Sequence, residues 1–326
     1  MAPRASSCCG LRESRGAGAT LAAVVREILP GTSWSKAREL CAQGRVLVDG
    51  EPVTDPARRL SGEERVEVRA GGPASKREPA LTDLVVHLDA EVAVVRKPAG
   101  ILTVPFERDD RDTLLSLTRV AIRRIEAKNG GKAKASPTLR AVQRLDKETS
   151  GLVVFARTVA AQRHLQEQLA AHTVLRRYLA LAHGAAEDAV YETLLVPDRG
   201  DGLRGSWGVF KPTRGEPPAE AREAITRVTV LERLPGATRV ACELETGRQH
   251  QIRIHLAEAG HPLVGETVYI RDWRGPTIPS PRPMLHAAVL GFVHPRTGKR
   301  LRFEEPVPED FERVVGRLRR TRTSTD

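Results

Sequence analysis

The sequence has few aromatic residues and no long apolar run. Phe, Trp and Tyr make up 4% of its 326 residues, so extended stacking platforms for unpaired bases are not expected. No segment approaches the ~20 apolar residues of a membrane-spanning helix, so we expect no membrane association. The four cysteines, at positions 8, 9, 41 and 242, lack the paired spacing of zinc ligands. We therefore expect no metal site, and a reducing compartment, the cytoplasm.

Basic residues outnumber acidic ones. Lysine and arginine total 52 against 41 aspartates and glutamates, which gives a net charge of +11 and an isoelectric point near 10.0. A soluble protein can be basic without a functional reason. A polyanion, however, releases counterions when Lys and Arg neutralise its phosphates, and this release drives association. The charge balance therefore favours nucleic acid as the partner.

The N-terminal part of the chain predicts a tail, a small domain and a linker. Residues 1–17 are rich in Arg and Ser without the apolar core of a secretory signal. A mitochondrial transit peptide has a similar composition, but we favour a disordered basic tail. Residues 18–70 show two helix patterns (21–29 and 35–43), a hairpin signal at Asp49-Gly50, and strand alternation over 64–69. Gly, Pro and Ser then make residues 71–80 a linker by composition.

Residues 81–316 predict one larger domain, followed by a basic tail over 317–326. Strand patterns cover 85–98, 151–158, 174–184, 226–234, 238–245 and 285–295, and helix patterns cover 114–128, 159–172 and 250–260. A loop-rich region is expected from about residue 185 to 220. Strands outnumber clean βαβ units, so the predicted class is α+β, with a mixed, largely antiparallel sheet and flanking helices and loops. We expect a monomer.

One acidic residue is placed between two basic ones in the stretch QRLDKETSGL, residues 143–152. Asp146 lies between Arg144 and Lys147, and nearby positive charge favours the ionised carboxylate. An ionised carboxylate suits a nucleophile or a general base. From spacing alone, a turn-forming Asp in a surface salt bridge explains the pattern better. A glycoside-hydrolysing enzyme is a third reading, which would need a second catalytic carboxylate.

Five segments in the same order decide between these readings. RLDKETSGLVVFART resembles the signature of the RluA-type family of RNA pseudouridine synthases, and VVRKPAGILTVP, RRYLALAHG, ETGRQHQIRIHLAEAGHPLVGETVY and MLHAAVLGFVHP resemble its other motifs. The resemblance covers residues 84–316. It implies isomerisation of uridine within RNA, no cofactor, and a catalytic set of Asp146, Tyr178 and Arg253. It also implies RNA contacts from Arg144, Lys147, Arg248, His250 and Gln251.

The sequence departs from the family pattern at three places. Gln143 stands where the family usually has His, Gln249 where it usually has Thr, and Glu266 where it usually has Asp. All three residues of the implied catalytic set are present. The resemblance implies that these departures affect the choice of target or the rate of the reaction. They also leave an alternative open, a catalytically weak RNA-binding or ribosome-assembly factor on the same fold.

The small domain carries a resemblance of its own. SWSKARELCAQGRVLVDGEPV resembles the RNA-binding module shared by a small-subunit ribosomal protein and tRNA ligases, although Trp34 replaces its usual Arg. The resemblance implies that Lys36, Arg38 and Arg45 present positive charge to RNA. Such a module before this catalytic domain favours ribosomal RNA over tRNA as the substrate, while tRNA stays possible.

Overall fold

The computed structural model describes residues 10–13, 18–42, 44–60, 64–68, 81–106, 110, 112–128, 138–210 and 215–323. The chain divides into two compact units, residues 1–78 and 79–326. The expected linker, residues 71–80, lies outside the described residues, as does the basic loop 129–137. Among the helices that the structure describes, none combines the length and apolar character that a membrane span needs.

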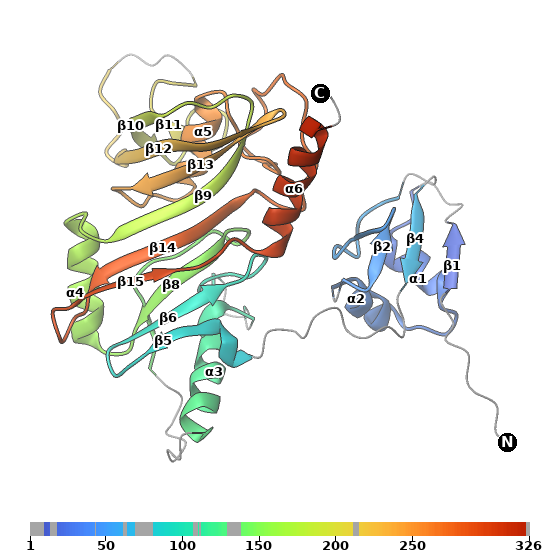
Figure 1. The fold of residues 1–326 in the computed structure, drawn as a ribbon, viewed down its shortest axis with the longest axis horizontal. Helices are drawn as coiled ribbons and strands as arrows, with labels where there is room; N and C mark the ends of the chain where they lie inside the picture. Colours follow the sequence, from blue (N-terminus) through green and yellow to red (C-terminus); the bar gives the residue numbers. More distant parts are fainter. Residues whose placement is uncertain are drawn as a thin grey trace. The chain divides into compact units, whose positions relative to one another are not determined.

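The small unit is a four-stranded antiparallel sheet with two helices (Figure 1). Its strands lie in the order β1 (Gly10–Glu13), β4 (Arg65–Val68), β2 (Val46–Val48) and β3 (Glu51–Pro52). The helices are α1 (Leu21–Ile28) and α2 (Trp34–Ala42), close to the expected ranges. They bury Leu21, Val25 and Leu40 against strand residues that include Val46 and Val66. Positive φ at Asp49 and Gly50 makes the expected tight turn between β2 and β3.

Parts of both expected tails are ordered. Strand β1 falls within residues 1–17 and pairs with β4 from Gly10↔Val68 to Glu13↔Arg65. The expected C-terminal tail from residue 317 continues helix α6 (Glu309–Thr323), because Leu318 is buried together with Phe311 and Val315. These residues therefore form a strand and a helix where the sequence predicted tails.

The large unit is built on an eleven-stranded, mostly antiparallel sheet, as the sequence predicted. Its main path runs β11–β10–β12–β13–β9–β14–β8–β6–β5, with β15 beside β14 and β7 beside β8. The strands are β5 (Val85–Leu88), β6 (Val92–Lys97), β7 (Arg140–Ala141), β8 (Ser150–Ala156), β9 (Leu175–His183), β10 (Ala189–Val196), β11 (Gly205–Ser206), β12 (Arg222–Leu234), β13 (Ala237–Leu244), β14 (Leu285–Val293) and β15 (Arg300–Glu304). The helices are η1 (Leu81–Leu84), α3 (Leu114–Lys128), α4 (Val159–Ala170), α5 (Gln251–Glu258) and α6.

Strand β14 joins two halves of this sheet. On one side it pairs antiparallel with β9, and on the other it pairs in parallel with β8 (Figure 1). The parallel contact is close, because a Cβ at Gly151 would lie 2.3 Å from the carbonyl oxygen of Ala287. Gly151 also has a φ of +119°, which L side chains rarely adopt. This glycine therefore lets the first residues of β8 approach β14.

The region expected to be mainly loop contains two strands. Strand β10 pairs with β12 from Ala189↔Val228 to Leu195↔Arg222, and β11 pairs with the end of β10. The alternation in β10 is obscured because Val190 and Leu194, on its exposed face, are also apolar. The prediction of a loop was therefore wrong for residues 189–196.

Alternating strand residues divide the helices between the two faces of the sheet. In β6, Val92 and Val94 pack in a cluster with Leu165 of α4. Ala93 and Val95, which point the other way, pack in a cluster with residues of α3 and α5 such as Ile122 and Ile252. The second face is the one that carries Tyr178, Leu145 and the candidate site.

Candidate active site

Asp146 lies in the segment that connects β7 to β8, and its carboxylate has two basic side chains as neighbours. Its side chain is 24% exposed. The nearest charged groups are Nη1 of Arg253, 3.6 Å from Oδ2, and Nε2 of His250, 3.9 Å from Oδ1. Among the described residues, no hydrogen bond is donated to this carboxylate. The carboxylate therefore has an ion-pair partner on one side and is open to solvent on another.

The backbone around Asp146 is fixed by two side chains from the Lys-Pro-Ala-Gly segment. Lys97, which is 1% exposed, donates to the carbonyl oxygens of Lys147 and Thr149 at 2.8 Å each. Thr103 accepts from the N–H of Leu145 and donates to its carbonyl oxygen. Burial lowers the pKa of Lys97 to about 7, against the opposing effect of the nearby carboxylates. The main chain on both sides of Asp146 is thus held from one neighbouring segment.

Arg282 holds the same segment from another direction. This residue is 5% exposed and donates to the carbonyl oxygen of Glu148 at 3.1 Å. Its other nitrogens pair with Asp310 of α6 at 2.6 and 3.1 Å and donate to Ser150. The C-terminal helix is thereby connected to the segment that carries Asp146.

Arg253 is held by a buried carboxylate. It projects from α5, and its side chain is 10% exposed. Its Nε and Nη2 donate to the two oxygens of Glu266 at 2.8 and 2.7 Å, which leaves Nη1 facing Asp146. Although burial acts to lower the pKa of Arg253, the bond to Glu266 raises it. The guanidinium therefore stays charged beside Asp146.

Glu266 is a residue whose part in this site sequence reasoning missed. Its side chain is fully buried, and Oε1 also accepts from the backbone N–H groups of Thr267, Val268 and Tyr269. Burial acts to raise the pKa of Glu266, but Arg253 and these N–H groups lower it. The signal in the sequence was the departure from Asp at this position. The longer side chain spans the distance from this turn to Arg253.

His250 completes the charged cluster. It precedes α5 in a left-handed conformation, with a φ of 60°. Its Nδ1 shares a hydrogen bond of 2.8 Å with the hydroxyl of Tyr269, and burial lowers the pKa of its imidazole. Tyr269 also lies against the guanidinium of Arg253, 5.3 Å from ring centre to Cζ. His250 therefore faces Asp146 inside the site.

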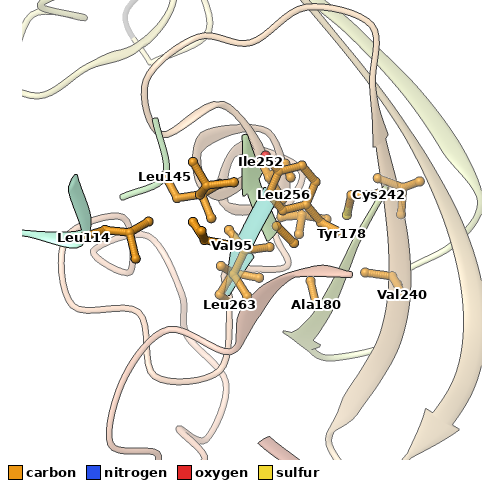
Figure 2. Close-up of a cluster of buried hydrophobic side chains, with 14 of the residues drawn as sticks. Val95, Leu114, Leu145, Tyr178, Ala180, Val240, Cys242, Ile252, Leu256 and Leu263 are labelled. Atoms are coloured by element: carbon orange, nitrogen blue, oxygen red, sulfur yellow. The ribbon is translucent and has the colours of Figure 1, made fainter. Parts of the chain in front are cut away.

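Tyr178 lies in the apolar cluster beneath these charges. It is 8% exposed on β9 and packs in one cluster with Leu145, Ile252 and Leu256 (Figure 2). Burial raises the pKa of its phenol to about 12, and the negative charge of Asp146 adds to that effect. Leu145 and Ile252, the chain neighbours of Asp146 and Arg253, belong to the same cluster and place Tyr178 near both residues. The structure thus brings together Asp146, Tyr178 and Arg253 from three distant segments.

The other expected contacts divide into exposed and buried residues. Arg144 and Lys147 are exposed, and among the described residues neither forms an ion pair. The side chains nearest to the carboxylate of Asp146 are those of His250 and Arg253. Arg248 is exposed and donates from Nε to the carbonyl oxygen of Glu223 at 2.9 Å.

Gln251 does not fit its predicted contact with RNA. It is 2% exposed, and its oxygen accepts from the hydroxyl of Thr246 and the N–H of Arg248 at 2.9 Å each. Its amide nitrogen donates to Ile225 and Thr226. All of its polar atoms are used inside the protein, so Gln251 fastens the start of α5 to β12. The prediction was wrong because the sequence alone does not reveal burial at a helix start.

In the small unit, the three predicted contacts lie on or just after α2. Lys36 and Arg38 are exposed, and Arg45 is half-buried. Lys36 pairs with Glu39 at 2.9 Å on the helix surface, a solvent-screened contact. Trp34 is 47% exposed and has the guanidinium of Arg26 over its ring at 4.4 Å.

The site in the large unit has the chemistry of a single charged carboxylate. Across the described part of the chain, no group of three His, Cys, Asp or Glu side chains could hold a metal ion. A carboxylate that is partly exposed beside a fixed guanidinium can attack carbon or accept a proton. The buried tyrosine beside it can contact the face of a planar group.

Known proteins and family models match most of the chain. Residues 91–258 match the model of a family described as RNA pseudouridylate synthase, and residues 20–66 match the S4 domain. A ribosomal large subunit pseudouridine synthase D from Neisseria meningitidis is 36% identical over 327 residues, which cover 93% of this chain and 79% of that protein. A protein of the same name from Pseudomonas aeruginosa is 32% identical over 339 residues, covering 94% and 93%.

A solved structure shows a similar fold. The human RNA pseudouridylate synthase domain containing 4 protein superimposes with a TM-score of 0.58 at 23% identity, over 74% of this chain and 94% of that one.

Proposed function

The chain belongs to the RNA pseudouridylate synthase family, and from that premise we propose that it isomerises uridines of large-subunit ribosomal RNA with Asp146 as its catalytic residue. The chain is a pseudouridine synthase, an isomerase, with an S4 domain for binding RNA. Family and enzyme class are those that the sequence motifs predicted. The target RNA and the role of each residue belong to the proposal.

Ribosomal RNA is supported as the substrate by the relatives. The two bacterial relatives are named as enzymes of the large ribosomal subunit, and this chain aligns with most of the length of each. The net charge of +11 suits a long polyanion. With this substrate the enzyme would act where ribosomes are assembled, and we expect the cytoplasm.

The reaction rearranges bonds without changing composition. The bond from N1 of uracil to C1′ of ribose breaks, the base turns, and a bond from C5 to C1′ forms. C5 loses a proton and N1 gains one. A carboxylate at the sugar can act by attacking C1′ or by assisting loss of a ribose proton. Both routes need an ionised carboxylate that is open to the substrate, and the position of Asp146 beside Arg253 is the observation that carries the proposal.

Tyr178 would contact the uracil ring. A base inside a stacked strand is out of reach of a carboxylate, so the target nucleotide must leave the stack. Tyr178 lies beneath the charged cluster, where it offers an aromatic face to the extruded base. Its phenol stays protonated at neutral pH, because burial raises its pKa to about 12.

The test is the change Asp146→Asn, which keeps the shape of the side chain and removes its charge. We expect conversion of uridine in large-subunit ribosomal RNA to fall below detection while RNA affinity is retained. Asp272→Asn, the same change at a side chain that is 70% exposed, should leave conversion unchanged. Substantial turnover by the Asp146→Asn protein would exclude the assignment. Binding without turnover by the wild type would instead favour the RNA-binding or assembly factor that Gln143 and Gln249 leave open.

A further inference from the structure

A cavity of about 210 Å³ lies on the side of α5 that faces away from the core cluster. Its floor is apolar and consists of Leu195 and Val196 at the end of β10 together with Ile254 of α5. Its rim is polar. The remaining lining residues are Pro197, Arg204, Glu220, Arg222, Gly247, Arg248 and Gln249. We call this space the Arg204 cavity.

The rim of the Arg204 cavity is positively charged. Three guanidinium groups face one carboxylate, that of Glu220. Arg222 donates to the carbonyl oxygens of Ala219 and Ala221 at 2.6 and 2.8 Å, so its position is fixed by its own loop. Arg248 donates from Nε to the carbonyl oxygen of Glu223, and its two terminal nitrogens have no partner among the described residues. Arg204 has no hydrogen bond or ion pair within the described part of the chain, so its whole fork of donors is available.

A fourth guanidinium, that of Arg176, lies behind the wall of the Arg204 cavity. Arg176 is 8% exposed, and it donates from Nη2 to the carbonyl oxygens of Leu244 and Glu245. Its Nε is buried without a partner. A Cβ at Gly247 would lie 2.5 Å from Nη1 of Arg176. The glycine therefore lets this charge approach the cavity wall, and of the residues that line the cavity only Glu220 is acidic.

The Arg204 cavity is adjacent to the active site along the chain. Arg248 and Gln249 on its rim directly precede His250, whose imidazole lies 3.9 Å from Asp146. Burial is the main cause of the lowered pKa of His250, and the charge of Arg204 is a minor cause after that of Arg253. A group bound in this cavity would therefore lie next to a nucleotide whose sugar is at Asp146.

We propose that the Arg204 cavity binds a backbone phosphate of the RNA strand next to the target uridine, with Arg204 as its principal contact. A guanidinium fork matches phosphate oxygens in a bidentate manner. The apolar floor lowers the local dielectric constant and strengthens that contact. None of the lining residues is aromatic, so the cavity lacks the stacking surface that a base would favour. This inference rests on the proposed function, since it places the substrate strand of that reaction.

The variant Arg204→Gln, with Arg204→Lys beside it, tests the proposal on in-vitro transcribed large-subunit ribosomal RNA. We expect Arg204→Gln to weaken binding about 10-fold, the loss of a charge-assisted contact. The slope of log K against log salt should fall by ~0.7–0.9, the share of one phosphate. Arg204→Lys should recover the salt slope and part of the affinity.

A matched control and a mapping experiment make the test specific. Arg163→Gln removes an exposed arginine from α4, outside the residues that line the cavity, and should change binding less. Ethylation of one phosphate beside the target uridine should weaken the binding of RNA to the wild-type protein. It should cause no further loss of binding to Arg204→Gln. An unchanged affinity and salt slope, or equal losses in both variants, would overturn the inference. An inactive wild type would refute the proposed function instead, and the binding comparison would still be readable.

Discussion

The two charged residues at the centre of the site are held in opposite ways. Asp146 is held through its backbone, by Lys97 and Thr103 on the main chain at either side, while its carboxylate accepts no hydrogen bond from any described residue. Arg253 is held through its side chain, by two bonds to the buried Glu266. One residue therefore has a fixed position and a free functional group, and the other has a functional group that is itself fixed.

This difference matches what each residue must do. A carboxylate that reacts with the sugar gains nothing from internal hydrogen bonds, because those would have to be broken during the reaction. In the proposed reaction, a guanidinium beside the carboxylate acts best when its orientation is set before substrate arrives. The comparison predicts that variants at Arg253 and Glu266 change the rate most, and that variants around the backbone of Asp146 change it less.

The largest effect is expected at Arg253. Arg253→Ala leaves the carboxylate of Asp146 without its partner, and we expect the single-turnover rate to fall about 10³-fold, the loss of one charged group at the reacting centre. Arg253→Lys restores the charge but not the planar fork, so it should be impaired yet measurable. Arg248→Ala is the matched control, since Arg248 is exposed at the adjacent turn; it should weaken binding with a normal rate for bound RNA. A normal rate in Arg253→Ala would show that Arg253 only binds RNA.

The next effect is expected at Glu266. Glu266→Gln keeps the shape but removes the charge that orients Arg253, and we expect kcat to fall ~10–100-fold with little change in KM, as for other residues that position a functional group. Glu266→Asp should recover part of this loss, because it restores the charge at a shorter reach. Glu305→Gln removes another acid that pairs with an arginine, Arg96, and should leave kcat unchanged. Equal losses in both Gln variants would point to stability as the cause.

A smaller effect is expected from the backbone contacts. Thr103→Val removes the hydroxyl that bonds both the N–H and the carbonyl oxygen of Leu145, and should lower stability by about 1–3 kcal/mol, since buried polar groups lose their partner. We expect the rate to fall about 10-fold, the equivalent of about 1.4 kcal/mol in the barrier. Thr118→Val is the control, because that hydroxyl bonds only within helix α3, to Leu114. If Thr118→Val also lowers the rate, the loss in Thr103→Val cannot be attributed to the backbone of the Asp146 segment.

The last effect is on stability, and it depends on pH through Lys97. Its pKa is lowered from 10.5 to about 7 in the folded protein, so between these values the unfolded chain binds a proton that the folded protein has released. Stability relative to Lys97→Met should therefore rise with pH from about 7 to about 10, by at most about 1.4 kcal/mol per pH unit. Chemical denaturation in a Trp34→Phe background would follow Trp207 and Trp273 of the large unit. If the difference in the free energy of unfolding between the wild type and Lys97→Met does not change with pH, Lys97 stays charged over this range.

The sequence predicted the elements of this site better than the contacts between its side chains. The elements that carry Asp146, Tyr178 and Arg253 were found because β8, β9 and α5 have clear apolar patterns and family motifs. The bond from Arg253 to Glu266 could not be predicted, since it depends on how the turn after α5 folds back. The burial of Gln251 was missed as well. A polar residue at the start of a helix can face water or can form hydrogen bonds to a neighbouring strand, and the sequence does not distinguish the two. Strand β10 was missed because both of its faces carry apolar residues.

The place of β14 in the sheet has a consequence for how the protein is made. Asp146 lies just before β8, in one half of the sheet, and Tyr178 lies on β9, in the other half; β14, late in the chain, pairs with both. During synthesis, the two halves can each form local contacts before β14 leaves the ribosome, but they cannot be joined in one sheet. The catalytic pocket is therefore completed among the last steps of folding, and a nascent chain lacking β14 should bind RNA through its S4 domain without modifying it. Release of the C-terminal segment would serve as the step that switches the enzyme on.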